Sequence, residues 1–140
     1  MHGAYDVVLF DLYGTLVDGR GTAIDGAREL LLSLPAERWA VVTSCGRRVA
    51  RGLVDSAGLP RPAVLIAAED VAGGKPAPDC YLKAAEAFGV SPQRCVAVED
   101  SVPGATAARL AGMDVLEVGR GRKLRDLQFR VNENGAIEVK

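Results

Sequence analysis

Six polar residues of the chain have types and placements that suit phosphoryl-transfer chemistry. They follow short apolar runs or lie in a Gly-Pro loop: Asp11, Thr43, Ser44, Lys75, Glu99 and Asp100. A carboxylate such as Asp11 can attack phosphorus and form an aspartyl phosphate. Mg²⁺ is typically held by one or two carboxylates together with phosphate and water, a role that suits Asp11 and Asp100. An ammonium such as that of Lys75 stabilises the negative charge of a transferring oxygen.

Two hydroxyl residues, Thr43 and Ser44, precede a predicted helix, whose positive end can meet a phosphate through backbone N–H groups. Each of the six polar residues also has an ordinary structural explanation. A lone aspartate after a strand is often a turn or helix cap, and adjacent acidic residues are often a solvated loop. Their combined placement favours one active site over six unrelated surface positions.

Alternating strand and helix signals indicate how these residues are positioned. The predicted strands are short and apolar: 7–10, 39–43, 63–66, 95–98 and 114–118. The predicted helices lie between them: from about 25 to Pro35, 47–57, 78–88 and 101–112, with Asp25 and Ser101 as candidate N-caps. This spacing predicts βαβ units in an α/β, Rossmann-like three-layer fold with a mostly parallel sheet. Ligands bind beyond the carboxyl ends of such strands, where the polar residues occur.

The C-terminal segment has a different pattern. Residues 129–131 and 136–139 flank an Asn-Gly turn, which predicts a β-hairpin. Such a hairpin can either extend the sheet at its edge or mediate self-association. The basic run 120–125 is either a solvated loop or a site that recognises an anionic substrate.

Length and composition favour one soluble domain over residues 1–140. The chain has 140 residues, is 49% hydrophobic and carries a net charge of −1. Neither nucleic acid nor an anionic membrane is therefore an expected partner. No apolar run approaches the ~20 residues of a membrane span, and the N-terminus lacks signal-peptide features, so we expect a cytoplasmic protein. The three cysteines form no CxxC pair and are expected to be reduced thiols: Cys45, Cys80 and Cys95.

The sequence resembles the haloacid dehalogenase superfamily, in particular its phosphatase and phosphoglucomutase-like branch. The resemblance covers roughly residues 5–118, and four segments carry it in order: 7–18, 40–44, 74–79 and 98–101, the last continuing through Gly104 and 111–113. The resemblance implies that Asp11 is the nucleophile and that Lys75 and Thr43 bind phosphate, with Ser44 beside them. It also implies a Mg²⁺ site that comprises Asp11, the Tyr13 backbone carbonyl, Asp100 and, as a further ligand or in support, Glu99.

Tyr13 departs from the phosphatase pattern, in which an aspartate two residues after the nucleophile is the general acid and base. The stretch 11–15, Asp-Leu-Tyr-Gly-Thr, resembles the metal-independent dehalogenase branch instead, whereas Glu99 and Asp100 resemble the phosphatase branch. A tyrosine hydroxyl keeps its proton at neutral pH, so it can donate a proton but does not readily accept one. We therefore expect Tyr13 to impair a phosphatase, most of all on poor leaving groups such as sugar alcohols.

The cap domain of the superfamily has no room in this chain. Only about thirty residues separate Asp11 from Thr43, and the interval between Lys75 and Glu99 is shorter still. We therefore expect a core domain without a cap, whose active-site cleft is open. Water must then be excluded by a partner subunit in a homo-oligomer or by a large substrate. The substrate is expected to be a small phosphorylated metabolite or a larger phosphorylated molecule.

Three functions follow from these residues. The leading hypothesis is a Mg²⁺-dependent phosphohydrolase that forms an aspartyl phosphate on Asp11. The second is a 2-haloacid dehalogenase that forms an ester on Asp11 without metal. Dehalogenases draw a halide-binding arginine from the cap, and three arginines are candidates to lie near the cleft instead: Arg20, Arg47 and Arg48. The third is a catalytically weak, metal-binding pseudoenzyme.

Overall fold

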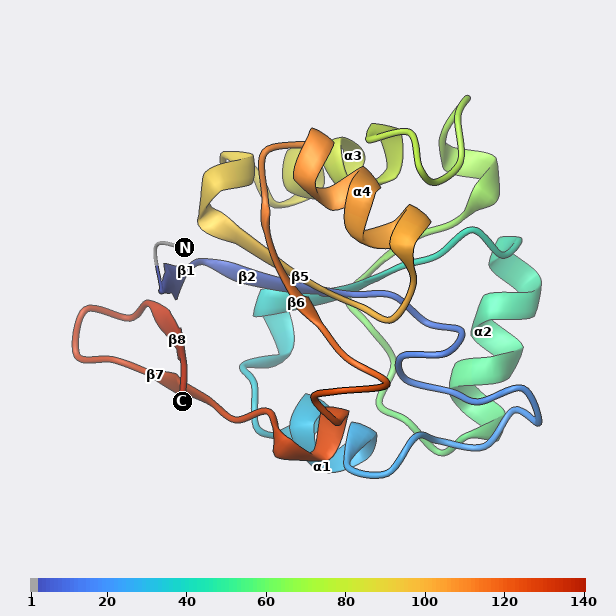
Figure 1. Cartoon of the computed structure of the whole chain (residues 1–140), viewed down its shortest axis with the longest axis horizontal. Helices are drawn as coiled ribbons and strands as arrows, with labels where there is room; N and C mark the ends of the chain where they lie inside the picture. Colours follow the sequence, from blue (N-terminus) through green and yellow to red (C-terminus); the bar gives the residue numbers. More distant parts are fainter. Residues whose placement is uncertain (1–2) are drawn as a thin grey trace.

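The computed structural model describes residues 3–140 and contains a five-stranded parallel sheet between two layers of helices (Figure 1). The strand order is β4-β3-β2-β5-β6. The strands of this sheet are β2 (Val7–Phe10), β3 (Trp39–Val42), β4 (Val64–Ile66), β5 (Cys95–Glu99) and β6 (Asp114–Glu117). The helices are α1 (Ala27–Leu32), α2 (Arg47–Ser56), α3 (Asp79–Phe88) and α4 (Val102–Leu110), with short 3-10 turns η1 (Ala36–Arg38), η2 (Ala68–Asp70), η3 (Pro92–Arg94) and η4 (Leu124–Asp126). The predicted Rossmann-like α/β fold is confirmed.

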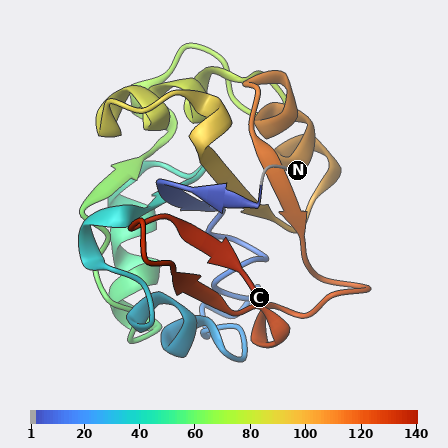
Figure 2. The same ribbon diagram turned by 90° about the vertical axis from the view of Figure 1, so that its left-hand side faces the viewer.

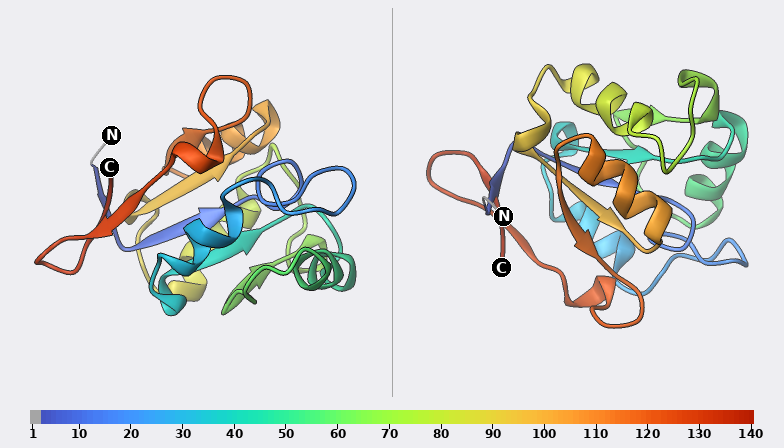
Figure 3. Two further views of the ribbon diagram at one scale, coloured as in Figure 1. Left: turned by 90° about the horizontal axis from the view of Figure 1, so that it is seen from below. Right: turned by 45° about the horizontal axis from the view of Figure 1, so that its top comes forward.

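The two faces of the sheet have separate apolar cores, because successive side chains of a strand point to opposite faces. Phe10 of β2 packs in the core beneath α1 and α2, whereas Leu9 packs in the core beneath α3 and α4. In β5, Cys95 and Ala97 belong to the α3 and α4 side. Glu99 continues that series by alternation, so its side chain enters the layer of α3 and α4 rather than solvent. Figure 3 shows the helical layers on both faces of the sheet.

The C-terminal hairpin does not extend the parallel sheet, so that option was wrong. Its strands β7 (Phe129–Val131) and β8 (Ile137–Val139) form a separate antiparallel sheet with β1 (Ala4–Tyr5), in the order β1-β8-β7. Figure 2 shows this small sheet, in which β1, near the start of the described chain, pairs with the C-terminal strand β8. Arg38 links the hairpin to the start of the parallel sheet. Its guanidinium donates to the backbone oxygen of Asp6, just before β2, at 2.7 Å, and to that of Gly135 in the hairpin turn. The two residues of β1 carried too little pattern to be predicted as a strand.

The helix caps agree only in part with the predictions. Ser101 caps α4 as expected, because its hydroxyl accepts the backbone N–H of Gly104 at 3.2 Å. Asp25 does not cap α1, which follows Gly26 instead, and Asp25 pairs with Arg125 at 3.1 Å. Gly26 has φ +86°, and a Cβ there would lie 2.7 Å from the Cα of Arg125. A residue with a side chain would therefore be strained at this position, and the helix begins two residues later than the sequence suggested.

The chain between β2 and β3 contains no inserted domain. After β2 it forms a loop held by isolated bridges between Tyr13 and Val17 and between Val17 and Ala23, followed by α1 and η1. The tip of this loop lies over α2, where a Cβ on Gly21 would be 3.7 Å from the Leu53 side chain. This short loop occupies the interval in which the superfamily resemblance implies a cap.

Two expectations about the whole chain can be compared with the structure. The three cysteines are free thiols, with Cys80 and Cys95 buried and Cys45 half-buried. Among the described residues, none of the helices has the length and apolar character that crossing a bilayer requires.

Candidate active site

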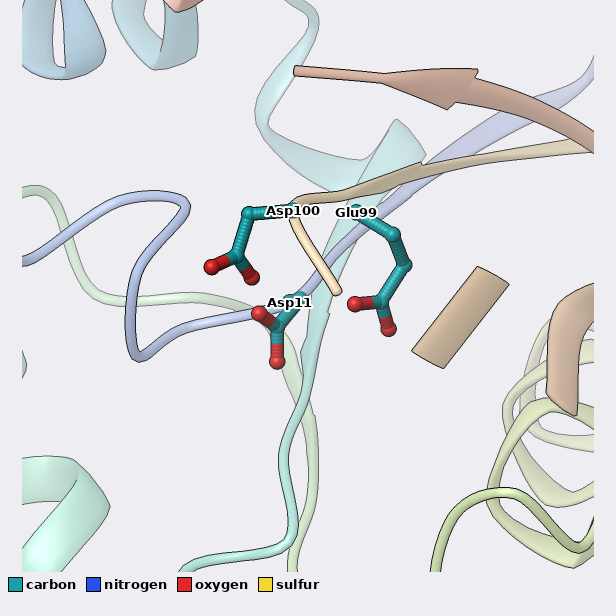
Figure 4. A group of neighbouring side chains, drawn as sticks. All are labelled: Asp11, Glu99 and Asp100. Carbon is teal, nitrogen blue, oxygen red and sulfur yellow. The ribbon is translucent and has the colours of Figure 1, made fainter. Parts of the chain in front are cut away.

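Three carboxylates converge at the carboxyl ends of β2 and β5. Asp11, Glu99 and Asp100 each place one oxygen so that these atoms all lie within 4.8 Å of one another. Figure 4 shows the three side chains gathered at these strand ends. The sheet itself brings them together: β2 and β5 are parallel neighbours, and the backbone N–H of Asp11 donates to the Val98 carbonyl at 3.0 Å. The structure therefore juxtaposes the acidic residues that the sequence placed at separate strand ends.

Lys75 reaches this cluster from the loop before α3. Its Nζ donates to Asp11 Oδ1 at 2.8 Å, to Glu99 Oε2 at 2.6 Å and to the Val42 carbonyl at 3.1 Å. An ammonium has three N–H donors, so all three have acceptors within the protein. The Lys75 side chain is only 7% exposed. The ammonium is thus a buried bridge between the strand ends of β2, β3 and β5.

Gly14 and Thr15 contact the carboxylates of the acidic cluster, although the sequence patterns assigned no role to either residue. The Thr15 hydroxyl lies 3.0 Å from Asp11 Oδ2 and 3.1 Å from Asp100 Oδ1, and its single proton can be donated to one of them at a time. Gly14 has φ +88°, and a Cβ there would overlap the Asp100 carboxylate. Both the backbone angle and the close approach require glycine at this turn.

The electrostatics of the cluster favour a bound cation. Burial raises the pKa of Asp11 to about 7, with the Lys75 ammonium opposing this shift and the Glu99 carboxylate adding to it. Burial also raises the pKa of Glu99 against the effect of Lys75. Burial alone would lower the pKa of Lys75, but Asp11 and Glu99 outweigh it and raise that pKa above its ordinary value. Three carboxylates face one ammonium, so the fully ionised cluster carries two excess negative charges, which a divalent cation would neutralise.

The cluster opens into a hollow of about 370 Å³ at the edge of the sheet. Its lining contains most of the predicted site residues: Asp11, Tyr13, Thr43, Ser44, Cys45, Lys75, Asp100, Ser101 and Pro103. Thr43 is buried, and its hydroxyl accepts the Cys45 N–H at 3.1 Å. The first N–H of α2, on Arg47, donates to the Glu69 carboxylate at 2.9 Å, so this part of the helix N-terminus is already capped.

Tyr13 borders the hollow but does not hydrogen-bond to Asp11 in the described part of the chain. Its side chain is 46% exposed, and its hydroxyl donates to the Gly19 carbonyl at 3.2 Å. The Tyr13 hydroxyl is therefore bound by the loop between β2 and α1 rather than by Asp11. This orientation could not be read from the motif.

The arginines that the sequence placed near the cleft do not line this hollow. Arg47 donates to Asp70 and, at 3.1 Å, to the Leu65 carbonyl. It borders a larger depression of about 760 Å³ along the outer edge of β4, away from the acidic cluster. Arg20 and Arg48 are exposed and are absent from the lining of the hollow. The acidic cluster, rather than the larger depression, is the place where chemistry-bearing groups converge.

The sequence of this chain is similar to those of known proteins. The sequence model described as haloacid dehalogenase-like hydrolase matches residues 20–112. The chain is 46% identical to hexitol phosphatase A of Escherichia coli (strain K12) over 99 residues, which make up 69% of this chain and 46% of that protein. It is 36% identical to glycerol-1-phosphate phosphohydrolase 2 of Saccharomyces cerevisiae over 95 residues, 63% of this chain and 38% of that protein. The chain thus spans less than half the length of these two relatives.

A solved structure extends the likeness to the fold. A hydrolase of Deinococcus radiodurans R1, crystallised with bound phosphate and sodium, aligns with a TM-score of 0.78 at 25% identity. The alignment covers 89% of this chain and 85% of that chain.

Proposed function

Because this chain belongs to the haloacid dehalogenase-like hydrolase family, we propose that it is a Mg²⁺-dependent phosphohydrolase that forms an aspartyl phosphate on Asp11. One observation carries the proposal. Asp11 lies at the carboxyl end of β2, in contact with the ammonium of Lys75 and close enough to Asp100 for the two carboxylates to bind the same metal ion. The two curated relatives are named for the hydrolysis of phosphate esters, which supports a phosphorylated metabolite as substrate.

The acidic cluster fits a magnesium ion. It offers hard carboxylate oxygens and two excess negative charges, and one oxygen of the buried Glu99 side chain, Oε1, has no hydrogen-bond partner among the described residues. The ion would be held by Asp11, Asp100, the Tyr13 carbonyl and Glu99. Its charge would neutralise the phosphoryl oxygens and orient them toward the nucleophile.

The protein's own residues would divide the reaction into two displacements. In the first, an Asp11 carboxylate oxygen attacks phosphorus, the P–O bond to the alcohol breaks, and the departing alkoxide takes a proton from solvent water. In the second, water attacks the same phosphorus and gives its proton to solvent, the bond between phosphorus and the Asp11 oxygen breaks, inorganic phosphate departs and the Asp11 carboxylate is regenerated. Lys75 would compensate charge on the transferring oxygens, while Thr43 and Ser44, which line the same hollow, would bind the phosphoryl group.

The dehalogenase alternative has one feature in its favour, the Asp-Leu-Tyr-Gly-Thr stretch at 11–15. The rest of the site favours phosphoryl transfer. The excess negative charge around Asp11 would repel a halide leaving group, and no arginine lines the hollow in the described part of the chain.

We also propose that residues 1–140 work as one core domain without a cap. The loop from Tyr13 to Ala23 stands where the resemblance implies a cap, and Tyr13, which lines the hollow, is 46% exposed. Either the substrate itself or a second copy of the chain would then exclude water during the reaction.

Release of phosphate from p-nitrophenyl phosphate and acetyl phosphate tests the proposed function. We expect release with Mg²⁺ and none with EDTA, and no chloride release from 2-chloropropionate under either condition. Chloride release without metal would assign the dehalogenase reaction. Mg²⁺ binding with neither reaction would assign the pseudoenzyme.

Mg²⁺ should stabilise the protein more at pH 8 than at pH 5. The pKa of Asp11 is raised in the folded state, so this group favours folding fully below the ordinary carboxyl pKa near 4, and that contribution is lost as pH rises through about 7. A bound cation should offset the loss. We expect Mg²⁺ to raise Tm by roughly 3–8 °C at pH 8 and by less than about 2 °C at pH 5. Scanning calorimetry with Mg²⁺ or EDTA measures this.

The matched control for this experiment is Asp11→Asn, which removes the titrating group at nearly constant shape. In this variant, the metal-free protein should lose less stability between pH 5 and pH 8 than the parent does. Equal Mg²⁺ shifts of Tm at the two pH values would contradict the assignment of Asp11 as a metal ligand.

A further inference from the structure

The carboxylate of Glu99 is held in a closed slot beneath the candidate active site. The side chain is fully buried, and Oε2 accepts two hydrogen bonds, one from Lys75 Nζ at 2.6 Å and one from the hydroxyl of Tyr81. Tyr81 lies on α3 and is itself fully buried. The Tyr81 hydroxyl donates to the same carboxylate that accepts from Lys75. The mechanism described above gives this hydroxyl no role.

Gly104 of α4 also packs against the Glu99 carboxylate. A Cβ at this position would overlap the Glu99 carboxylate, so the helix backbone itself limits where that group can lie. Ser101 fixes this turn of α4 through its bond to the Gly104 N–H. Glu99 is therefore confined between Tyr81 on one helix and Gly104 on the next.

Tyr81 contacts Lys75 as well as Glu99. The Lys75 Nζ lies 5.4 Å from the centroid of the Tyr81 ring, within the range of a cation–π interaction. A tyrosine hydroxyl has one O–H donor, and the acceptor of the buried Tyr81 hydroxyl is Glu99 Oε2. Glu99 thus receives a donor that holds Oε2 where it can accept from Lys75.

We propose that Tyr81 is a positioning residue that acts through Glu99 to hold the ammonium of Lys75 against Asp11. This proposal rests on the phosphohydrolase function proposed above. It also specifies how Lys75 can bind a phosphoryl oxygen although its three N–H groups already have acceptors. The neutral Val42 carbonyl, at 3.1 Å, is the weakest of them. The bonds to Asp11 and Glu99 are retained, and the third N–H is transferred from Val42 to the substrate.

The variant Tyr81→Phe removes the hydroxyl and keeps the ring. Groups that orient the residues of a metal site typically contribute 10- to 100-fold to activity or metal affinity. We expect kcat for p-nitrophenyl phosphate to fall by about 10-fold, with KM changed by less than about 2-fold, because Lys75 is misplaced relative to the reacting atoms rather than lost.

Tyr5→Phe is a closely matched control. Tyr5 is also fully buried, and its hydroxyl donates to a carboxylate, Asp114 Oδ2, at 2.8 Å, but it lies in β1 of the small sheet. This variant should lose stability as Tyr81→Phe does and leave kcat and KM unchanged. If both variants lower kcat alike, the effect of Tyr81 is a general consequence of weakened packing and the proposal fails.

A double-mutant cycle with Glu99→Gln tests whether Tyr81 acts on Lys75 through Glu99. Glu99→Gln should itself lower kcat, and adding Tyr81→Phe to it should lower kcat by less than about 2-fold further, since residues in one hydrogen-bond network are not additive. A full 10-fold fall in the Glu99→Gln background would show that Tyr81 does not act through Glu99, and would overturn the proposal.

A measurement without turnover separates this proposal from the proposed function. The Lys75 ammonium, buried and triply hydrogen-bonded, should give a slowly exchanging ¹⁵N NMR signal in the metal-free protein. We expect Tyr81→Phe to shift or broaden this signal and Tyr5→Phe to leave it unchanged. An unchanged signal in Tyr81→Phe would overturn the positioning role. A perturbed signal in a protein that hydrolyses no phosphate ester would uphold the positioning role and reject the phosphohydrolase.

Discussion

Replacing Asp11 with asparagine should lower kcat for p-nitrophenyl phosphate by about 1000-fold or more, the largest effect expected of any single substitution in this chain. The amide has nearly the shape of the carboxylate, but it is a poor nucleophile and forms no acyl phosphate. Its oxygen or nitrogen can still meet Thr15, which lies 3.0 Å from Asp11 Oδ2. The fold should therefore remain intact, and the loss should fall on the chemical step.

Two measurements distinguish this loss from unfolding. Mass spectrometry of the acid-quenched parent after exposure to acetyl phosphate and Mg²⁺ should show the added mass of one phosphoryl group, on the peptide that contains Asp11. Asp11→Asn should show none. The control Asp55→Asn makes the same chemical change on α2, where Asp55 pairs with Arg61 on the surface at 3.0 Å, and it should keep full activity. A phosphorylated peptide elsewhere, or an active Asp11→Asn protein, would end the proposed mechanism.

Replacing Tyr13 with aspartate should raise kcat by about 100-fold on alkyl phosphates, whose leaving alkoxides require a proton. Tyr13 borders the hollow beside Asp11, and its hydroxyl donates to the Gly19 carbonyl. A carboxyl group at this position can give a proton to the leaving oxygen and then accept one from the attacking water. The gain on p-nitrophenyl phosphate should be smaller, because nitrophenolate leaves with little protonation.

Tyr13→Asn provides the control for this experiment, since it has the size of aspartate without its acid–base function. Any gain caused only by opening the hollow or by releasing the loop at Gly19 should appear in both variants. The ratio of kcat between Tyr13→Asp and Tyr13→Asn on an alkyl phosphate therefore measures proton transfer. A ratio near one would show that position 13 takes no part in proton transfer in this protein.

Some features of the fold and site were predictable from local sequence patterns. Short apolar runs that alternate with helix signals predicted the parallel sheet, and the carboxyl ends of parallel strands share one edge. This is why Asp11, Lys75 and Asp100 could be expected to meet, and the structure places their side chains together. The hairpin at 129–139 was likewise predictable from its Asn-Gly turn, because that turn depends on the conformational preferences of adjacent residues.

Other features depend on contacts between residues that are far apart in the chain. The hairpin pairs with β1, whose two residues are too few to carry a strand signal. Gly26, which precedes α1, packs closely against the backbone of Arg125, about a hundred residues away along the chain.

For the site, the sequence alone determined which reactive groups stand at the carboxyl ends of the strands, since strand ends and periodicity are local properties. It could not determine that Glu99 turns inward to Tyr81 and Gly104, or that the Tyr13 hydroxyl is held by Gly19. Those orientations were decided by the packing of α3 and α4 on the sheet and by the bridged loop. A side chain's direction depends on which neighbours fill the space around it, and only the tertiary structure assembles those neighbours.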